Sequence, residues 1–291
     1  KRLYNNVRKF HLSDCMSQCL SAWEKKGDRG KMITYDFTEK VVVVTGGGRG
    51  IGKRIAQRFV QAGAHVVVCR KSPEGLEELE AELLSAWEGS PELAPTVHAF
   101  ALDLDDVKAI PLFFERVAEL YDHIDILINN AGIMTSEDLS EITPERYDLV
   151  MDTNVRGMLF CAQWFAGYHQ QQQTPGAIVN MASVSSVTYI PNNLLYNISK
   201  ASVVTLTKTL ARALGPDGIR VNAVGPGSTP TDMNAALYAN PERERALCEK
   251  LPLGRRATKD DIANCVLFLA SDAADYVTGQ VLYAEGGWLL V

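Results

Sequence analysis

Along residues 38–291, hydrophobic and polar positions follow two alternating patterns. Short apolar runs such as KVVVVTG, HVVVCR and IDILINN are rich in β-branched residues, which is typical of strands buried on both faces of a sheet. Longer stretches such as GIGKRIAQRFVQ separate them, and their apolar residues recur every three or four positions, as on one helix face. This alternation predicts an α/β fold: a single domain with a Rossmann-like, doubly wound parallel sheet and helices on both faces.

Residues 1–37 follow a different pattern and form a predicted N-terminal extension, while residues 38–291 form the predicted dinucleotide-binding catalytic domain. In the extension, apolar side chains recur at helical spacing from Leu12 to Trp23, and KKGDRGK then breaks the pattern. We expect one short amphipathic helix that packs on the domain or on another subunit. A partner-binding arm is the alternative.

Composition argues against several classes of protein. The 291 residues carry a net charge of -6 without a Lys/Arg-rich run, so we expect no nucleic-acid partner. No apolar run approaches the roughly 20 residues that span a bilayer, so we expect no membrane partner. The six cysteines contain no C-x-x-C pair, which favours a reducing, cytoplasmic setting, and no metal is expected at the active site.

The segment TGGGRGIGKR, residues 45–54, fits two phosphate-binding patterns. Gly47, Gly52 and Lys53 match most of a nucleoside-triphosphate loop, but Arg54 stands where that loop needs a Ser or Thr to bind Mg²⁺. Alternatively, the glycines follow a strand directly and open a helix, so that backbone N–H groups face the pyrophosphate of a dinucleotide. The second interpretation predicts hydride transfer instead of phosphoryl transfer.

Five further motifs follow this loop in a fixed order: NNAG at Asn129–Gly132, Asn154 in NVRG, Ser183, YNISK at Tyr196–Lys200 and PGSTPT at Pro226–Thr231. Together with the glycine loop, they make residues 38–291 resemble the short-chain dehydrogenase/reductase family, in its compact single-domain branch. The resemblance implies an enzyme that interconverts a ketone and a secondary alcohol with a nicotinamide cofactor.

The resemblance also implies four catalytic residues. Tyr196 would donate a proton to the carbonyl in reduction, or accept one in oxidation. Lys200 shares a helix face with Tyr196, should lower the pKa of its hydroxyl, and would bind the nicotinamide ribose. Ser183 would hydrogen-bond the substrate oxygen. Asn154 would hold a water of the proton relay, bond strand backbone, or do both.

The end of the second predicted strand distinguishes the two nicotinamide cofactors. An acidic residue there would bind the ribose 2′-hydroxyl of NAD(H), whereas this chain has Arg70 followed by Lys71. Arg49 lies within the glycine loop, and two guanidinium groups suit a 2′-phosphate through charge-assisted hydrogen bonds. We therefore expect NADP(H). NAD(H) is the alternative if Arg70 is only a solvated charge.

The remaining cofactor-binding residues are implied by their places in the motifs. Asp103 resembles the family residue that contacts adenine, and Thr231 the one that binds the carboxamide or pyrophosphate. Thr229 stands where an aliphatic residue is common. The full expected set is Gly46, Arg49, Gly50, Ile51, Gly52, Arg70, Lys71, Asp103, Leu104, Asn130, Ala131, Gly132, Tyr196, Lys200, Pro226, Gly227, Thr229 and Thr231.

The residues leave the small-molecule substrate open: a cyclic or medium-sized ketone, a β-keto thioester as for a 3-oxoacyl reductase, or a polyol. The predicted pocket has a lid at residues 232–252 and walls formed by Met134, Thr135, Ser185, Tyr189, Asn192 and Asn193. An NAD-dependent alcohol, sugar or steroid dehydrogenase and a non-catalytic nucleotide-binding protein are the alternative functions. The resemblance further implies a homotetramer or homodimer, with the long helix that carries Tyr196 at an interface. Because the segment GQVLYAEGGWLLV ends in apolar residues, we also expect a buried C-terminus that faces another subunit.

Overall fold

The structure, a computed structural model, describes residues 35–235 and 240–291. Within them, one sheet has the strand order β3-β2-β1-β4-β5-β6-β7, with every neighbouring pair parallel. The predicted fold is confirmed, whereas the helix predicted near the N-terminus lies outside the described residues. The strands are β1 (Val41–Thr45), β2 (His65–Arg70), β3 (Val97–Ala101), β4 (Ile126–Asn129), β5 (Gly176–Met181), β6 (Ile219–Pro226) and β7 (Val281–Ala284).

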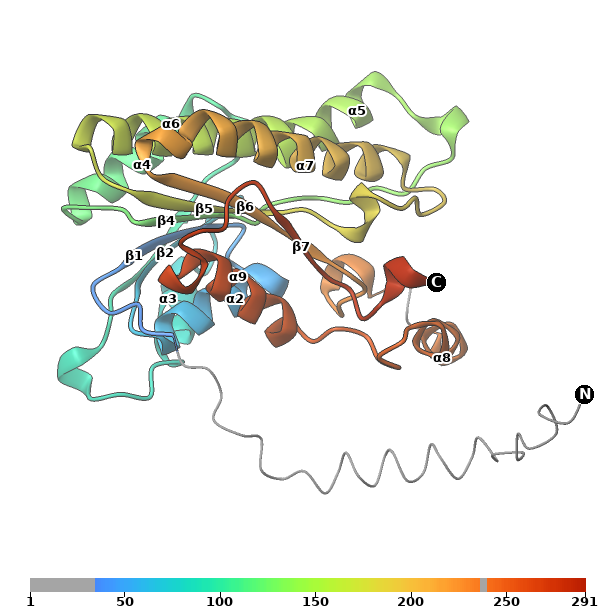
Figure 1. Ribbon diagram of the computed structural model, residues 1–291, viewed down its shortest axis with the longest axis horizontal. Coiled ribbons are helices and arrows are strands. Elements are labelled where there is room, and N and C mark those ends of the chain that lie inside the picture. The colour runs from blue at the N-terminus through green and yellow to red at the C-terminus, as the bar shows by residue number, and fades with distance from the viewer. Residues whose placement is uncertain (1–34, 236–239) are drawn as a thin grey trace, which may run out of the picture. The chain divides into compact units, whose positions relative to one another are not determined.

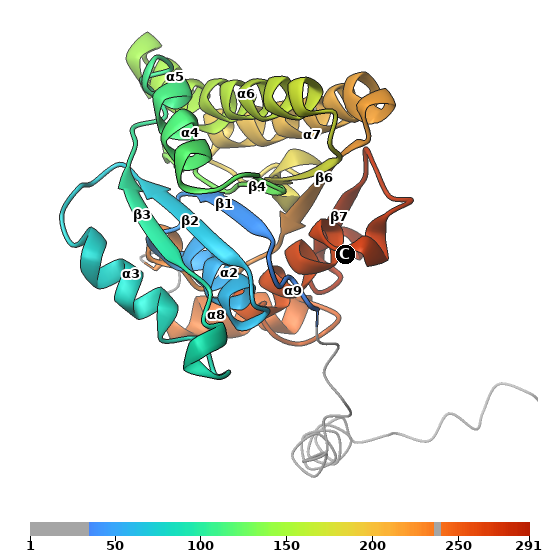
Figure 2. The ribbon, with the colours of Figure 1, turned by 90° about the vertical axis from the view of Figure 1, so that its left-hand side faces the viewer.

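Helices cover both faces of this sheet (Figure 1, Figure 2). One layer consists of α4 (Ala109–Leu120), α6 (Gly157–Gln172) and α7 (Leu194–Leu214). The opposite layer consists of α2 (Gly50–Gln61), α3 (Leu76–Leu84) and α9 (Lys259–Ala270). Two further helices, α5 (Pro144–Met151) and α8 (Pro241–Lys250), precede α6 and α9 in the chain.

The central strand β1 shows why the sheet needs both helix layers. Val42 and Val44 belong to the core shared with α2, α3 and α9, whereas Val43 belongs to the core shared with α4, α6 and α7. Because successive strand side chains point to opposite faces, an all-apolar strand is stable only when both faces are covered. Phe59 of α2 is fully buried in the first core, and truncating such a side chain to Ala costs about 3–5 kcal/mol.

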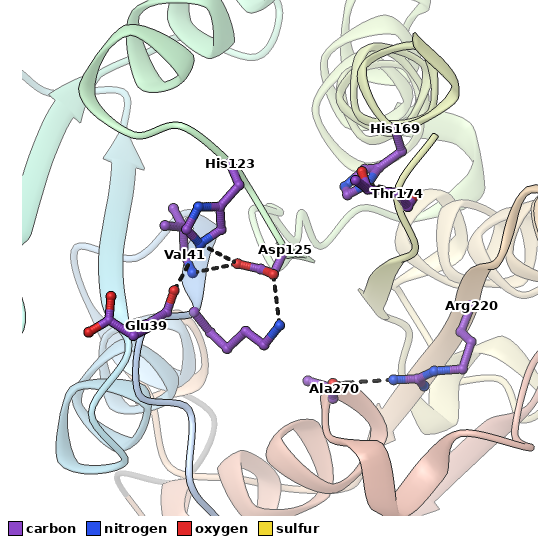
Figure 3. A network of polar contacts seen from close by, with 9 residues as sticks. Glu39, Val41, His123, Asp125, His169, Thr174, Arg220 and Ala270 are labelled. Atoms are coloured by element: carbon purple, nitrogen blue, oxygen red, sulfur yellow. Dashed lines mark hydrogen bonds and ion pairs between the residues drawn. The ribbon is translucent and has the colours of Figure 1, made fainter. Parts of the chain in front are cut away.

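Polar contacts connect residues at the N-terminal ends of several strands (Figure 3). Asp125, just before β4, accepts hydrogen bonds from the Val41 N–H at 2.9 Å and from Lys40 Nζ at 3.0 Å. Arg220 at the start of β6 donates to the Ala270 carbonyl at 3.2 Å, at the end of α9. In sheets of this kind, ligands bind to the loops at the opposite side, which follow the carboxyl ends of the strands.

The helical region predicted around MDTNVRGM is interrupted. Between α5 and α6, residues Asp152–Arg156 form a π-helical turn that contains Asn154. Such turns are rare, disturb the regular hydrogen-bond ladder, and are frequent at functional sites. The sequence predicts the helix here but gives no sign of this turn.

Candidate active site

A cleft of about 850 Å³ opens where β1, β2, β4, β5 and β6 end. Every residue of the cofactor-binding set expected from the sequence lines this cleft, as does the catalytic residue Ser183. Asn154, in contrast, is fully buried behind the cleft wall. The structure therefore brings the separate motifs into one continuous site.

The glycine loop forms the floor of the cleft between β1 and α2. Gly46 and Gly50 have φ of 64° and 60°, a region that L side chains avoid. A Cβ on Gly52 would lie 2.2 Å from Asn130 Nδ2, whose amide donates to the Gly46 carbonyl at 3.1 Å. These close approaches leave room for a pyrophosphate at the N-terminus of α2, where backbone N–H groups attract anions. The loop therefore fits a dinucleotide.

The alternative triphosphate-binding interpretation does not fit the side chains. Lys53, which would have to reach the phosphates, forms an ion pair with Glu82 of α3. Arg54 Nε donates to Asp260 Oδ1 of α9 at 2.8 Å. Both cations are thus engaged by neighbouring helices.

Thr45 is a structural residue of this site whose role sequence reasoning missed. Its Oγ1 accepts hydrogen bonds from the N–H groups of Asn130 at 3.0 Å and Ala131 at 3.1 Å. It thereby joins the glycine loop to the segment after β4. The available signal was a single hydroxyl at the end of a strand that otherwise consists of valines.

Three of the residues expected to be catalytic meet at the inner end of the cleft. Ser183, directly after β5, hydrogen-bonds the hydroxyl of Tyr196 on α7. Lys200, one turn further along α7, places Nζ 5.6 Å from the centroid of the Tyr196 ring. The same Nζ donates to the Met181 carbonyl of β5 at 2.7 Å. Tyr196 and Lys200 therefore share one face of α7, as predicted.

Burial controls the proton affinities of this group. It lowers the pKa of Lys200, which is only 3% exposed, to about 8. Burial raises the pKa of Tyr196, and the hydrogen bond with Ser183 offsets only part of that rise. The expected lowering of the Tyr196 pKa by Lys200 is therefore wrong in direction here, because desolvation of the phenolate dominates. Tyr196 holds its proton at neutral pH, which suits a proton donor.

Asn154 connects two segments that carry residues of the expected site. Its Oδ1 accepts from the Ile133 N–H at 2.8 Å, and its Nδ2 donates to the Ile133 carbonyl at 2.9 Å. The same Nδ2 donates to Ser199 Oγ at 3.0 Å, and Ser199 Oγ donates to the Tyr196 carbonyl at 2.8 Å. The side chain of Asn154 therefore ties the loop after β4 to α7. The role of Ser199 was missed, although it directly precedes Lys200.

Gly132 separates Asn154 from the cleft. A Cβ at this position would lie 3.1 Å from Asn154 Oδ1 and 3.5 Å from Lys200 Nζ. The contact with Asn154 would be tight, whereas the one with Lys200 would be an ordinary van der Waals contact, so a side chain at this position would press mainly on Asn154.

The other end of the cleft carries the expected cations. Arg70 Nε donates to the Ser72 carbonyl at 3.0 Å, and its side chain lies over Gly48. Among the described residues, its terminal guanidinium nitrogens have no hydrogen-bond or ion-pair partner, and the same holds for the exposed side chain of Arg49. The two guanidinium groups expected to bind a 2′-phosphate are therefore available for one.

Lys71 differs from the two arginines. Its Nζ forms ion pairs with Asp103 at 2.7 Å and Asp105 at 3.4 Å. These contacts raise the pKa of Lys71 and neutralise its charge locally. Lys71 lines the cleft as predicted, but its charge is already matched within the chain.

The substrate side of the cleft agrees with only part of the prediction. Met134, Ser185 and Asn193 line it as expected. Thr135, Tyr189 and Asn192 do not, and their assignment as walls is wrong: Thr135 is turned into the protein, Tyr189 is 87% exposed, and Asn192 is exposed. Of the predicted lid, Asp232–Asn234 reach the cleft, and residues 236–239 lie outside the described part of the chain. The missed wall residues include Ile190 and Trp288.

Comparison with known proteins agrees with this geometry. The family model described as enoyl-(acyl carrier protein) reductase matches residues 46–289. The chain is 40% identical over 250 residues to 3alpha-hydroxysteroid dehydrogenase of Mediterraneibacter gnavus, spanning 85% of this chain and 96% of that protein. It is 39% identical to the 3-oxoacyl-(acyl-carrier-protein) reductase FabG of Thermotoga maritima, spanning 86% and 98%.

Solved structures match it as well. ElxO with NADP bound has a TM-score of 0.78 and 30% identity, covering 87% of this chain and 99% of that chain. A Beutenbergia cavernae structure with bound NADP at low occupancy has a TM-score of 0.81 and 34% identity, covering 89% and 100%. Fold and site together define a Rossmann-type oxidoreductase. The chain belongs to the short-chain dehydrogenase/reductase family. None of its described helices is long and apolar enough to cross a bilayer.

Proposed function

We propose that this protein is an NADP(H)-dependent oxidoreductase that interconverts a ketone and a secondary alcohol. The observation that carries the proposal is the meeting of Tyr196, Ser183 and Lys200 at the inner end of a cleft that continues to Arg70. One end supplies acid–base chemistry and the other supplies unpaired positive charge. The complete catalytic set favours this enzyme over a non-catalytic nucleotide-binding protein.

The proton chemistry follows from the pKa directions. Tyr196 holds its proton at neutral pH, so it can donate that proton to the substrate oxygen as the carbonyl is reduced. Ser183 shares a hydrogen bond with Tyr196, and its hydroxyl would also stabilise the charge that develops on the substrate oxygen. Lys200 lies beneath the Tyr196 ring, where its ammonium would stabilise the phenolate left behind. When bound, the nicotinamide supplies or accepts the hydride.

The preference for NADP(H) over NAD(H) rests on Arg49 and Arg70. A 2′-phosphate placed between them would receive charge-assisted hydrogen bonds from the Arg49 guanidinium and from the terminal guanidinium nitrogens of Arg70, whose Nε alone is hydrogen-bonded within the described chain. The hydrogen bond from Ser72 is the main cause of the lowered pKa of Glu74, and the nearby Arg70 adds to it. The exposed Glu74 carboxylate opposes the phosphate in part. Structures of family members with bound NADP support the same assignment.

The test is to follow NADPH and NADH consumption with a panel of cyclic ketones, open-chain hydroxyketones and a β-keto thioester. We expect oxidation of NADPH with at least one ketone class, and a much weaker reaction with NADH. Tight NADPH binding without turnover of any ketone would favour the non-catalytic alternative. Faster turnover with NADH would favour the NAD-dependent alcohol, sugar or steroid dehydrogenase.

We further propose that the chain forms a homotetramer or homodimer. At its C-terminal end, Leu290 is 82% exposed and Val291 is 77% exposed in the single chain. Neighbouring apolar side chains that are exposed on a surface can mark a site where another subunit binds. Sedimentation at micromolar concentration should show an assembly, and a monomer there would contradict the proposal. The cytoplasmic location stays a prediction.

A further inference from the structure

Beside the catalytic residues lies a group of buried polar atoms that have no hydrogen-bond partner. Within the described residues six such side-chain atoms occur, and four of them belong to Thr135, Glu137 and Asn197. They are Thr135 Oγ1, both carboxylate oxygens of Glu137 and Asn197 Oδ1. Glu137 is only 8% exposed. Such unpartnered atoms are informative, because folded proteins satisfy nearly all of their buried polar groups.

The backbone places these residues next to the cleft. The Glu137 N–H donates to the Asn192 carbonyl at 2.9 Å, and Glu137 pairs with Asn193 in an isolated parallel bridge. Asn193 and Met134 both line the cleft. Asn197 follows one turn later on α7, and its N–H donates to the Asn193 carbonyl at 2.9 Å. The Glu137 segment therefore lies directly behind the wall that Asn193 forms, on the Tyr196 side.

The protein does not satisfy the Glu137 carboxylate by itself. Within the described residues, its ion-pair partner is Arg146, whose Nε lies 3.9 Å from Glu137 Oε1, beyond hydrogen-bond distance, on a side chain that is 54% exposed. Burying a carboxylate without hydrogen bonds is costly, so a fold that keeps one there loses stability. The unpartnered atoms of Glu137 and Asn197 are all acceptors, so the missing partner is a donor.

We propose that Glu137, Asn197 and Thr135 form a hydroxyl-binding subsite that extends the substrate pocket and makes polyhydroxylated ketones, such as open-chain ketoses, the preferred substrates. The inference rests on the proposed function and deepens it. Asn193 controls access to the subsite, because its Nδ2 has only a weak 3.5 Å contact with Met134 Sδ to hold it in the wall. A substrate hydroxyl that displaces this amide reaches acceptors that nothing else in the described chain occupies.

The first test compares two ketones with the same five-carbon skeleton, xylulose and 2-pentanone, using NADPH. Glu137→Gln should lower kcat/KM for xylulose about tenfold or more, the loss expected when a hydrogen bond to a charged group is weakened. The value for 2-pentanone should change by less than about twofold on the same scale. Glu115→Gln on the exposed surface of α4 removes the same charge and should change neither. Equal losses for both ketones would overturn the subsite.

A second measurement does not depend on turnover. Calorimetric titration of xylitol into the wild-type protein with NADP⁺ should show binding that Glu137→Gln removes and Thr135→Val weakens. No binding of xylitol to the wild type overturns the subsite, whether or not the enzyme reduces ketones. If no ketone is reduced but xylitol binds in this pattern, the proposed reaction fails and the subsite stands.

Thermal unfolding separates a ligand-binding role from a structural one. Glu137→Gln removes an unsatisfied buried charge, so the variant should unfold at a temperature equal to or higher than the wild type. A clear decrease would assign Glu137 to a structural pair with Arg146 and overturn the proposal. If Glu137→Gln does not fold, Glu137 has a structural role and the proposal for this residue is overturned. Thr135→Val still tests the binding of xylitol.

Discussion

The two ends of the cleft are built in opposite ways. At the catalytic end, Asn154, Lys200 and Ser183 are 0%, 3% and 7% exposed, and each is hydrogen-bonded to another element or loop. At the adenosine end, Arg49 is exposed, and Arg70 makes one hydrogen bond to a carbonyl two residues along the chain. One end is held by packing and buried hydrogen bonds, and the other presents loosely held charge.

This difference follows from what each end has to do. Proton transfer requires atoms at fixed hydrogen-bond distances, and only a packed network holds side chains that closely. Choosing between a 2′-hydroxyl and a 2′-phosphate requires charge more than fixed geometry. Exposed charges act over about 8 Å at physiological ionic strength and are weakened by salt. Substitutions at the catalytic end should therefore have larger effects on turnover, and those at the adenosine end on cofactor choice.

The largest expected effect is at Tyr196. Tyr196→Phe removes the proton donor and should lower kcat for ketone reduction by about 10³-fold, within the range known for general acids. The affinity for NADPH should stay within a few-fold, because the ring still fills its place beside Ser183. Turnover is measured from NADPH consumption and affinity from fluorescence titration. Activity within tenfold of the wild type would mean that another group donates the proton.

Lys200 should give the next largest effect, and its signature is a pH dependence. The kcat/KM for reduction should decrease as pH rises through about 8, where Lys200 loses its proton and no longer stabilises the phenolate. Lys200→Met should lose about 10²-fold at neutral pH and lack this part of the profile. A profile identical to that of the wild type would rule out Lys200 as the titrating group.

The same group makes stability depend on pH. The pKa of Lys200 is about 8 in the folded chain and 10.5 in the reference state, so between these values the unfolded chain binds a proton that the folded chain does not. The contribution of Lys200 to the free energy of unfolding therefore rises with pH across this window. Below pH 8 the cost of burying the ammonium is present in full. Comparing urea unfolding of wild type and Lys200→Met from pH 7 to 10 checks the sign.

At the adenosine end, Arg70→Asp should change cofactor preference instead of chemistry. The ratio of kcat/KM for NADPH to that for NADH should fall about 100-fold, as expected for the loss of charge-assisted hydrogen bonds and the introduction of repulsion. Arg116→Asp, on the exposed surface of α4, reverses the same charge and should leave the NADPH-to-NADH ratio unchanged. An unchanged NADPH-to-NADH ratio in Arg70→Asp would overturn the role of Arg70. In the wild type, the same ratio should fall with added salt, and a ratio that does not fall would argue against the contrast between the two ends of the cleft.

The smallest effect is expected at Lys71. Because Asp103 and Asp105 already pair with its ammonium, Lys71→Met should change the NADPH-to-NADH ratio by less than about threefold, as is usual for exposed ion pairs. Steady-state kinetics with both cofactors give the ratio. A change as large as that of Arg70→Asp would show that Lys71 leaves its aspartates to bind the phosphate.

The sequence predicted most of the fold because the relevant information is local. The run of valines in β1 indicates a strand covered on both sides, and the glycine loop directly after it marks the turn into α2. The spacing of Tyr196 and Lys200 places both on one helix face wherever α7 lies. In each case a few neighbouring residues carry the whole signal.

Other parts of the site could not be predicted because they depend on residues far apart in the chain. Trp288 reaches the cleft only because the chain after β7 returns to it. Tyr189 and Asn192 are exposed and miss the cleft, although Ile190 and Asn193 of the same loop line it. No periodicity in the sequence encodes either event.

From its sequence alone, this protein is a doubly wound α/β chain with a dinucleotide loop, a Tyr–Lys pair and arginines beside the cofactor site. Apolar patterning, glycine spacing and residue type determine these properties over short distances. Tertiary structure alone decided that the pKa of Tyr196 is raised, that Asp103 pairs with Lys71, and that the buried Glu137 carboxylate has no hydrogen-bond partner within the described chain. Proton affinity and ion pairing depend on desolvation and on neighbours brought from other elements, and only the packed chain sets these.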